Sequence, residues 1–80
     1  NELQKVTVFP TISKGKVHIK GGLIKNIEVI NINGQVVFEK SISVNNERYL
    51  ILDLKANSNG VYFIKIVGEG FVEIRKFVLQ

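Results

Sequence analysis

Hydrophobic and polar residues alternate along most of this chain with a period of two, the pattern of β-strands that bury one face. The most apolar run is 61–67, where Tyr62, Ile64 and Ile66 share one face. The opposite face of this run is also mostly apolar, with Lys65 as its one charged residue. A strand that can be buried on both faces belongs near the centre of a sheet. No part of the sequence shows helical periodicity.

Two glycine-containing turns mark the clearest corners. Asn33-Gly34 predicts a tight two-residue hairpin, with Ile32 and Gln35 facing each other across it. Gly60 ends a polar corner directly before the apolar run 61–67. We expect Gly60 to have a positive φ, which glycine adopts without steric cost.

Seven short runs of alternating apolar and polar residues, with turn signals at near-regular intervals, predict an all-β fold. The expected form is a seven-stranded antiparallel β-sandwich. An open barrel is the alternative. Segments 11–15 and 55–59 are expected to carry the chain between the two sheets. The facing of the last run is left open, because its two halves disagree: Val72 and Ile74 share one side, while Phe77 and Leu79 share the other.

The composition fits one small domain and excludes several classes of protein. The chain has 80 residues, a net charge of +4 and no cysteine, which excludes disulfides and thiolate chemistry. No apolar run is long enough to span a bilayer, and no secretory signal is visible. The lysines between Glu2 and Glu28 have no arginine and only one aromatic residue, Phe9, among them, so we expect no nucleic-acid partner. The first residue is not methionine, so we expect a piece of a longer protein.

Residues that could perform catalysis are isolated from one another. His18 is the only histidine, and it falls on the polar face of a short strand. The carboxylates are scattered, and no nucleophile elbow, phosphate-binding loop or zinc-helix motif is present. The corner from Asp53 to Asn59 is rich in oxygen, but one carboxylate is a poor start for a calcium site. We therefore expect no enzymatic activity, no catalytic residue, no metal site and no cofactor.

Five segments, in this order, resemble the C-terminal sorting domain of the type IX (Por) secretion system, type A. They are Val8-Phe9-Pro10 followed by Gly15, then IEVINING at 27–34, Leu52-Asp53-Leu54, NGVYFIKI at 59–66, and KFVLQ at 76–80. The chain departs from the family at Thr11-Ile12, where an Asn-Pro pair often follows the proline. It also has Asn31 where the family often has Asp, and Asn57 where an apolar residue is common.

The resemblance implies an immunoglobulin-like sandwich that occupies 5–80, with 1–4 as the end of a linker to an upstream cargo domain. Such domains act as address labels: the outer-membrane translocon and its shuttle protein recognise them, and a sortase-like cysteine protease commonly removes them. The cargo is then released or joined to surface lipopolysaccharide, so the implied destination is the cell surface or the medium, without a direct membrane span. The sorting-motif residues are Pro10, Gly15, Gly34, Asp53, Leu54, Gly60, Tyr62, Lys76, Phe77, Val78, Leu79 and Gln80.

Two further expectations concern surfaces. Residues 76–80 are expected to form a strand at a sheet edge, where the export machinery can read them directly. The alternative function is an immunoglobulin-like or fibronectin-like accessory module for carbohydrate binding or adhesion. A contiguous exposed patch of Tyr49, Phe63 and Phe71 would favour that alternative.

Overall fold

The computed structural model describes residues 6–42 and 49–80, and within them the chain forms strands and turns without a helix. None of these residues forms a helix long and apolar enough to cross a bilayer. The strands are β1 (Thr7–Phe9), β2 (Ile12–Ser13), β3 (Lys16–Lys20), β4 (Ile24–Asn31), β5 (Val36–Ser41), β6 (Tyr49–Asp53), β7 (Gly60–Gly68) and β8 (Phe71–Leu79).

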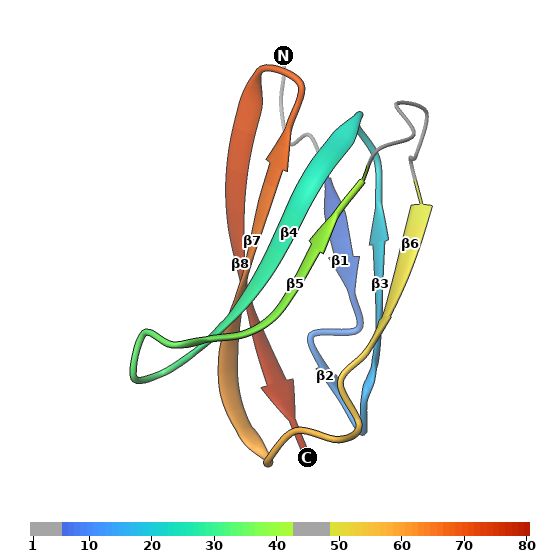
Figure 1. Ribbon diagram of the computed structural model, residues 1–80. Helices are drawn as coiled ribbons and strands as arrows, with labels where there is room; N and C mark the ends of the chain where they lie inside the picture. Colours follow the sequence, from blue (N-terminus) through green and yellow to red (C-terminus); the bar gives the residue numbers. More distant parts are fainter. Residues whose placement is uncertain (1–5, 43–48) are drawn as a thin grey trace.

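Two sheets face each other in a sandwich (Figure 1). One has three strands in the order β1-β3-β6, and the other has five in the order β2-β8-β7-β4-β5. Segment 55–59 carries the chain from β6 in the three-stranded sheet to β7 in the five-stranded sheet, as expected. Segment 11–15 does not connect the sheets in this way, because β1 and β3 on either side of it belong to the same sheet and only β2 within it joins the other. The chain also changes sheets between β3 and β4, which the turn signals did not indicate. Strand β7 lies between β4 and β8, which confirms its predicted central place.

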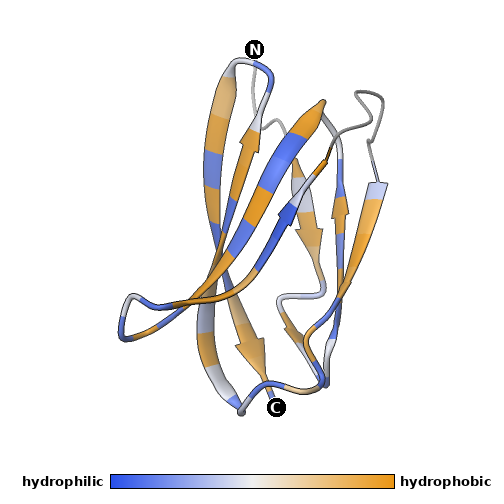
Figure 2. Ribbon diagram, in the orientation of Figure 1, coloured by the Kyte–Doolittle hydropathy of each residue, from blue (hydrophilic) through white to orange (hydrophobic). Residues whose placement is uncertain are grey.

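Alternation along the strands builds the core between the sheets (Figure 2). Each strand except β2 and β5 contributes buried apolar side chains. The buried residues are Val6, Val8, Val17, Ile19, Ile24, Ile27, Val29, Leu50, Leu52, Leu54, Tyr62, Ile64, Ile66, Phe77 and Leu79.

The described residues contain eight strands rather than the seven that the alternation predicts, because Ile12 and Ser13 form the short strand β2 inside the expected turn. Strand β2 runs parallel to the end of β8, with Ile12 beside Val78 and Ser13 beside Leu79. All other strand pairs are antiparallel. Two residues are too few to produce an alternating pattern, which explains why the sequence did not indicate this strand.

The hairpin between β4 and β5 has a three-residue loop, so the predicted two-residue turn is wrong by one position. Asn31 lies opposite Gln35: its amide donates to the Gln35 carbonyl at 2.9 Å, and its carbonyl accepts from the Gly34 amide at 3.0 Å. Gly34 has a φ of +85°. The Asn31 Oδ1 atom accepts hydrogen bonds from the amides of Asn33 (2.9 Å) and Gln35 (3.0 Å) and thereby closes the loop.

The facing of β8 is resolved by burial. Phe77 and Leu79 point into the core, whereas Val72 and Ile74 lie on the outer face and are each 59% exposed. The inward positions of the first half of β8 hold Glu73 and Arg75, which form an ion pair. The Arg75 guanidinium also donates to the Val6 carbonyl at 3.4 Å, so polar side chains occupy this part of the inward face.

The end of β8 is not an edge, contrary to the sequence-based expectation. Strand β7 pairs with one side of it, and β2 pairs with the other side at Val78 and Leu79. The short strand β2 therefore occupies the backbone groups that were expected to be open to a partner.

Candidate functional site

Most of the predicted sorting-motif residues gather at one end of the sandwich, where β3 and β7 begin and β6 and β8 end (Figure 1). We call this the motif end and define it as residues 10–16, 53–62 and 76–80. Gly34 alone lies apart from it, in the hairpin between β4 and β5. Segments more than 60 residues apart in the sequence thus meet here, as the pairing of Ile12 with Val78 shows.

Gly15 joins the first two segments of the motif end, residues 10–16 and residues 53–62. The Leu54 amide donates to the Gly15 carbonyl at 2.9 Å. A Cβ atom at position 15 would lie 3.1 Å from the Lys55 Cβ and 3.2 Å from the Lys55 Cα and N atoms. Glycine therefore allows the two turns to approach this closely, because a side chain at this position would force Lys55 to shift.

The closing residues are joined to both of the other segments. The Val78 amide donates to the Thr11 carbonyl at 2.8 Å, and the Gln80 amide donates to the Ser13 carbonyl at 2.9 Å. On the opposite side of β8, Phe77 pairs with Tyr62 and Leu79 pairs with Gly60. The end of the chain is therefore held between β2 and β7.

The corner from Asp53 to Asn59 uses its polar groups to close its own turns. The Tyr62 hydroxyl donates to the Ser58 carbonyl at 2.5 Å, and the Asn57 amide donates to the Leu54 carbonyl at 2.9 Å. The Asp53 Oδ1 atom accepts from the Lys55 amide at 3.1 Å. Residues 6–42 and 49–80 contain no group of three His, Cys, Asp or Glu side chains able to hold a metal. The absence of a calcium site remains a prediction.

The motif residues divide into a buried set and an exposed set. Gly15, Leu54, Tyr62, Phe77 and Leu79 are buried and hold the motif end together. Pro10, Gly34, Asp53, Lys76 and Gln80 are exposed, and Gly60 and Val78 are intermediate. A partner that reads the folded domain can contact only the exposed and intermediate residues, so the motif combines residues that fold the site with residues that display it.

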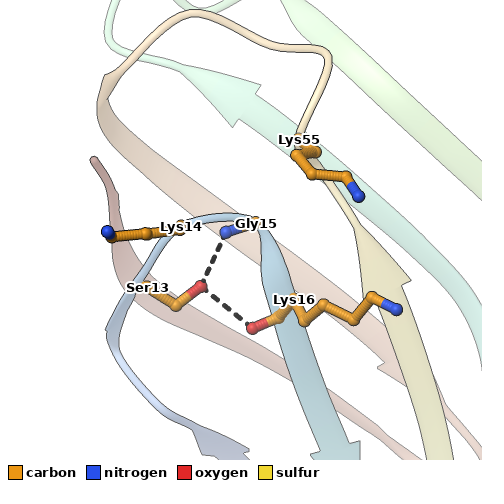
Figure 3. Close-up of a pocket in the computed structure, with 5 residues that line it drawn as sticks. All are labelled: Ser13, Lys14, Gly15, Lys16 and Lys55. Atoms are coloured by element: carbon orange, nitrogen blue, oxygen red, sulfur yellow. Dashed lines mark hydrogen bonds between the residues drawn. The ribbon is translucent and has the colours of Figure 1, made fainter.

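A shallow pocket of about 240 Å³ at the motif end was not indicated by the sequence (Figure 3). Its lining consists of Ser13, Lys14, Gly15, Lys16 and Lys55. The Ser13 hydroxyl accepts from the Gly15 amide and donates to the Lys16 carbonyl, each at 3.0 Å. Lys16 and Lys55 extend to one side of the turn and Lys14 to the other. The contact between Gly15 and Lys55 brings these distant lysines together, and only the fold reveals it.

His18 faces outward from the three-stranded sheet, as predicted, but it is partly covered by neighbours. Its Nδ1 atom and the Tyr49 hydroxyl share a hydrogen bond of 2.6 Å. The Phe9 ring stacks on the imidazole with a centroid distance of 5.2 Å and an interplanar angle of 8°. The expectation of no enzymatic activity remains a prediction.

The aromatic patch that would have favoured an adhesive module does not form. Tyr49 lies on the outer face of the three-stranded sheet, and Phe63 lies on the outer face of the five-stranded sheet. Phe71 packs against the core. The three rings therefore form no contiguous exposed patch.

Comparisons with known proteins agree with this geometry. The family model described as "Secretion system C-terminal sorting domain" matches residues 7–80. Among curated protein sequences, no match to the chain was found. The fold is similar to that in a structure of the CBM51-2 and INT domains from Clostridium perfringens ZmpB, with a TM-score of 0.58 and 22% sequence identity. That similarity covers 85% of this chain but only 16% of the other. Because the family model spans nearly all of the sequence, the chain belongs to the family of type IX secretion system C-terminal sorting domains.

Proposed function

We propose that this domain is a non-catalytic address label, attached to the C-terminal side of a larger cargo and read in its folded form. Its readers are the outer-membrane translocon of the type IX system and the shuttle protein that accompanies it. The sandwich is a variant of the immunoglobulin-like arrangement, in which the two-residue strand β2 is added to seven longer strands.

The observation that carries this proposal is the interlocking of the motif end. Hydrogen bonds join Gly15 to Leu54, Val78 to Thr11 and Gln80 to Ser13, so the displayed residues acquire their positions only when the whole domain folds. A signal built in this way reports that the domain at the end of its cargo has folded. Catalysis is not needed for that task.

We further propose the processing that follows export. Residues 1–4, which lie outside the described part of the chain, form the end of the linker to the cargo. A sortase-like cysteine protease cuts on the cargo side of the domain. The cargo is then joined to surface lipopolysaccharide or released into the medium.

A reporter fusion tests the sorting role. The reporter carries an N-terminal secretory signal and this domain at its C-terminus, in a host that has the type IX system. We expect the reporter outside the cell in this host and in the periplasm of a strain without the translocon. A reporter without the domain that leaves the cell equally well would contradict the proposal.

Direct reading of the closing residues needs substitutions, because Phe77 and Leu79 are part of the core and a deletion would remove them. The double change Lys76→Ala with Gln80→Ala alters only exposed side chains. We expect reduced export with an unchanged melting temperature. Export at the parent level would show that these two side chains are not read.

A further inference from the structure

The outer face of the five-stranded sheet carries a diagonal row of apolar side chains that crosses all five strands. We call it the outer stripe. Cross-strand pairs link Ile12 to Val78, Val78 to Val61, Phe63 to Ile30, and Ile30 to Val36. Ile12 is 53% exposed, Val36 is 50% exposed and Phe63 is 38% exposed. An apolar surface that extends across a whole sheet of a small domain is typical of a contact site.

A pocket of about 380 Å³ lies at the β2 end of the outer stripe. We call it the edge pocket; Thr11, Ile12, Lys76 and Val78 line it. Its volume is within the range of roughly 300–1,000 Å³ found for ligand pockets. The hydrogen bond between the Val78 amide and the Thr11 carbonyl fixes the two strands that form it. The outer stripe therefore ends in an open recess that can receive an apolar side chain.

Lys76 gives this recess a charge preference. It is exposed on the outer face, and it takes part in neither of the ion pairs, Lys25–Glu69 and Arg75–Glu73, found among residues 6–42 and 49–80. An ammonium beside an apolar recess favours a carboxylate on the occupant. The complementary segment thus combines an apolar anchor with an adjacent acidic group.

A lipid surface fits this face less well than a protein does. Glu28 and Glu39 lie opposite each other in the pairing of β4 with β5, on the same outer face as the outer stripe. Glu28 also pairs with Lys65, so this face carries charges of both signs and not the basic cluster that an anionic membrane attracts. A protein segment can instead avoid them by following the diagonal.

We propose that the outer stripe docks a segment of a protein of the type IX export machinery, with one apolar side chain in the edge pocket and a carboxylate at Lys76. The inference rests on the proposed sorting function and adds the surface and the chemistry of the partner. Two of the four pocket residues, Lys76 and Val78, belong to the closing motif.

The test places a carboxylate in the edge pocket from either strand. Ile12→Glu and Val78→Glu are compared in the reporter fusion with Val72→Glu, which lies on the same outer face of β8 and is 59% exposed. We expect each pocket variant to lower export by about tenfold or more, the loss typical of a disrupted anchor contact. Val72→Glu should export at the parent level, and thermal melts should show all three purified variants folded.

Three results would overturn the docking surface. Parent-level export of both pocket variants would do so while leaving the sorting role intact, provided that the parent fusion is exported. Binding of the parent domain to phosphatidylglycerol vesicles, lost in Val78→Glu, would make the occupant a lipid surface. Dimerisation of the parent in light scattering, lost in the same variant, would make it a second copy. A parent fusion that remains in the periplasm would instead refute the proposed function itself.

Discussion

Gly15 and Gly60 have nearly the same φ angle but different surroundings. Substitutions at these two positions therefore separate the conformational cost of a side chain from its steric cost. Their φ values are +154° and +153°. A Cβ at Gly60 would meet no heavy atom within 4 Å, whereas a Cβ at Gly15 would lie 3.1 Å from the Lys55 side chain. The conformational cost of a side chain is therefore similar at the two positions, and the steric cost differs.

We expect Gly60→Ala to lower the free energy of unfolding by about 1–3 kcal/mol, the cost of an L-residue in this region. Gly15→Ala should cost about 1–3 kcal/mol more, because the added methyl group is forced against Lys55. Urea denaturation of both variants measures the difference. Equal losses would show that the two turns can separate without penalty.

Asn31 offers a second test at the scale of one residue. Its Oδ1 atom accepts from the amides of Asn33 and Gln35, a role that an aspartate can also fill. Its Nδ2 atom donates to the Gln35 Oε1 at 3.0 Å, an exposed bond that an aspartate would lose. We expect Asn31→Asp to leave the free energy of unfolding within about 0.5 kcal/mol of the parent. Asn31→Ala should lower it by about 1–2 kcal/mol. Thermal melts decide this, and an equal loss in both variants would rule out the acceptor role.

At the scale of elements, the last strand contributes both to the core and to the display surface. Phe77 is fully buried, whereas its neighbour Lys76 is exposed on the outer face. We expect Phe77→Ala to lower the free energy of unfolding by about 3–5 kcal/mol. Lys76→Ala should change it by less than about 0.5 kcal/mol. Denaturant titration measures both; a mild loss in Phe77→Ala would mean that the end of β8 contributes little to folding.

The elements that could be predicted from the sequence are those with enough residues to alternate. The largely apolar faces of β7 predict a central place in a sheet, and the structure confirms this. Strand β2 was missed because two residues cannot alternate. The hairpin was misplaced by one residue because Asn-Gly fits a two-residue turn equally well, while the side chain of Asn31 selects the longer loop.

The site was predictable only in part, because its residues come from three distant segments. The resemblance identified Gly15, Leu54 and Phe77, but spacing along the chain does not reveal that they meet. The expected edge at residues 76–80 was wrong because β2 covers it. The shallow pocket lined by Lys14, Lys16 and Lys55 and the outer stripe both depend on strand register. Register determines which residues of neighbouring strands lie side by side.

At the scale of the whole molecule, the main question is whether the signal is the fold or a linear sequence. Ile19 is fully buried on β3 and lies outside all five motif segments. Ile19→Ala should lower the free energy of unfolding by about 2–5 kcal/mol without changing any motif residue. Its neighbour Lys20 is exposed on the same strand, so Lys20→Ala is the matched control.

If the folded motif end is what the machinery reads, export of the Ile19→Ala fusion should fall in proportion to its unfolded fraction. Growth at a lower temperature should restore export if circular dichroism shows that the domain refolds there. The Lys20→Ala fusion should be exported at the parent level at both temperatures. An Ile19→Ala domain that is unfolded at the growth temperature but exported normally would mean that a linear sequence suffices. In that case the hydrogen bonds that join Gly15, Val78 and Gln80 to their partners would serve stability alone.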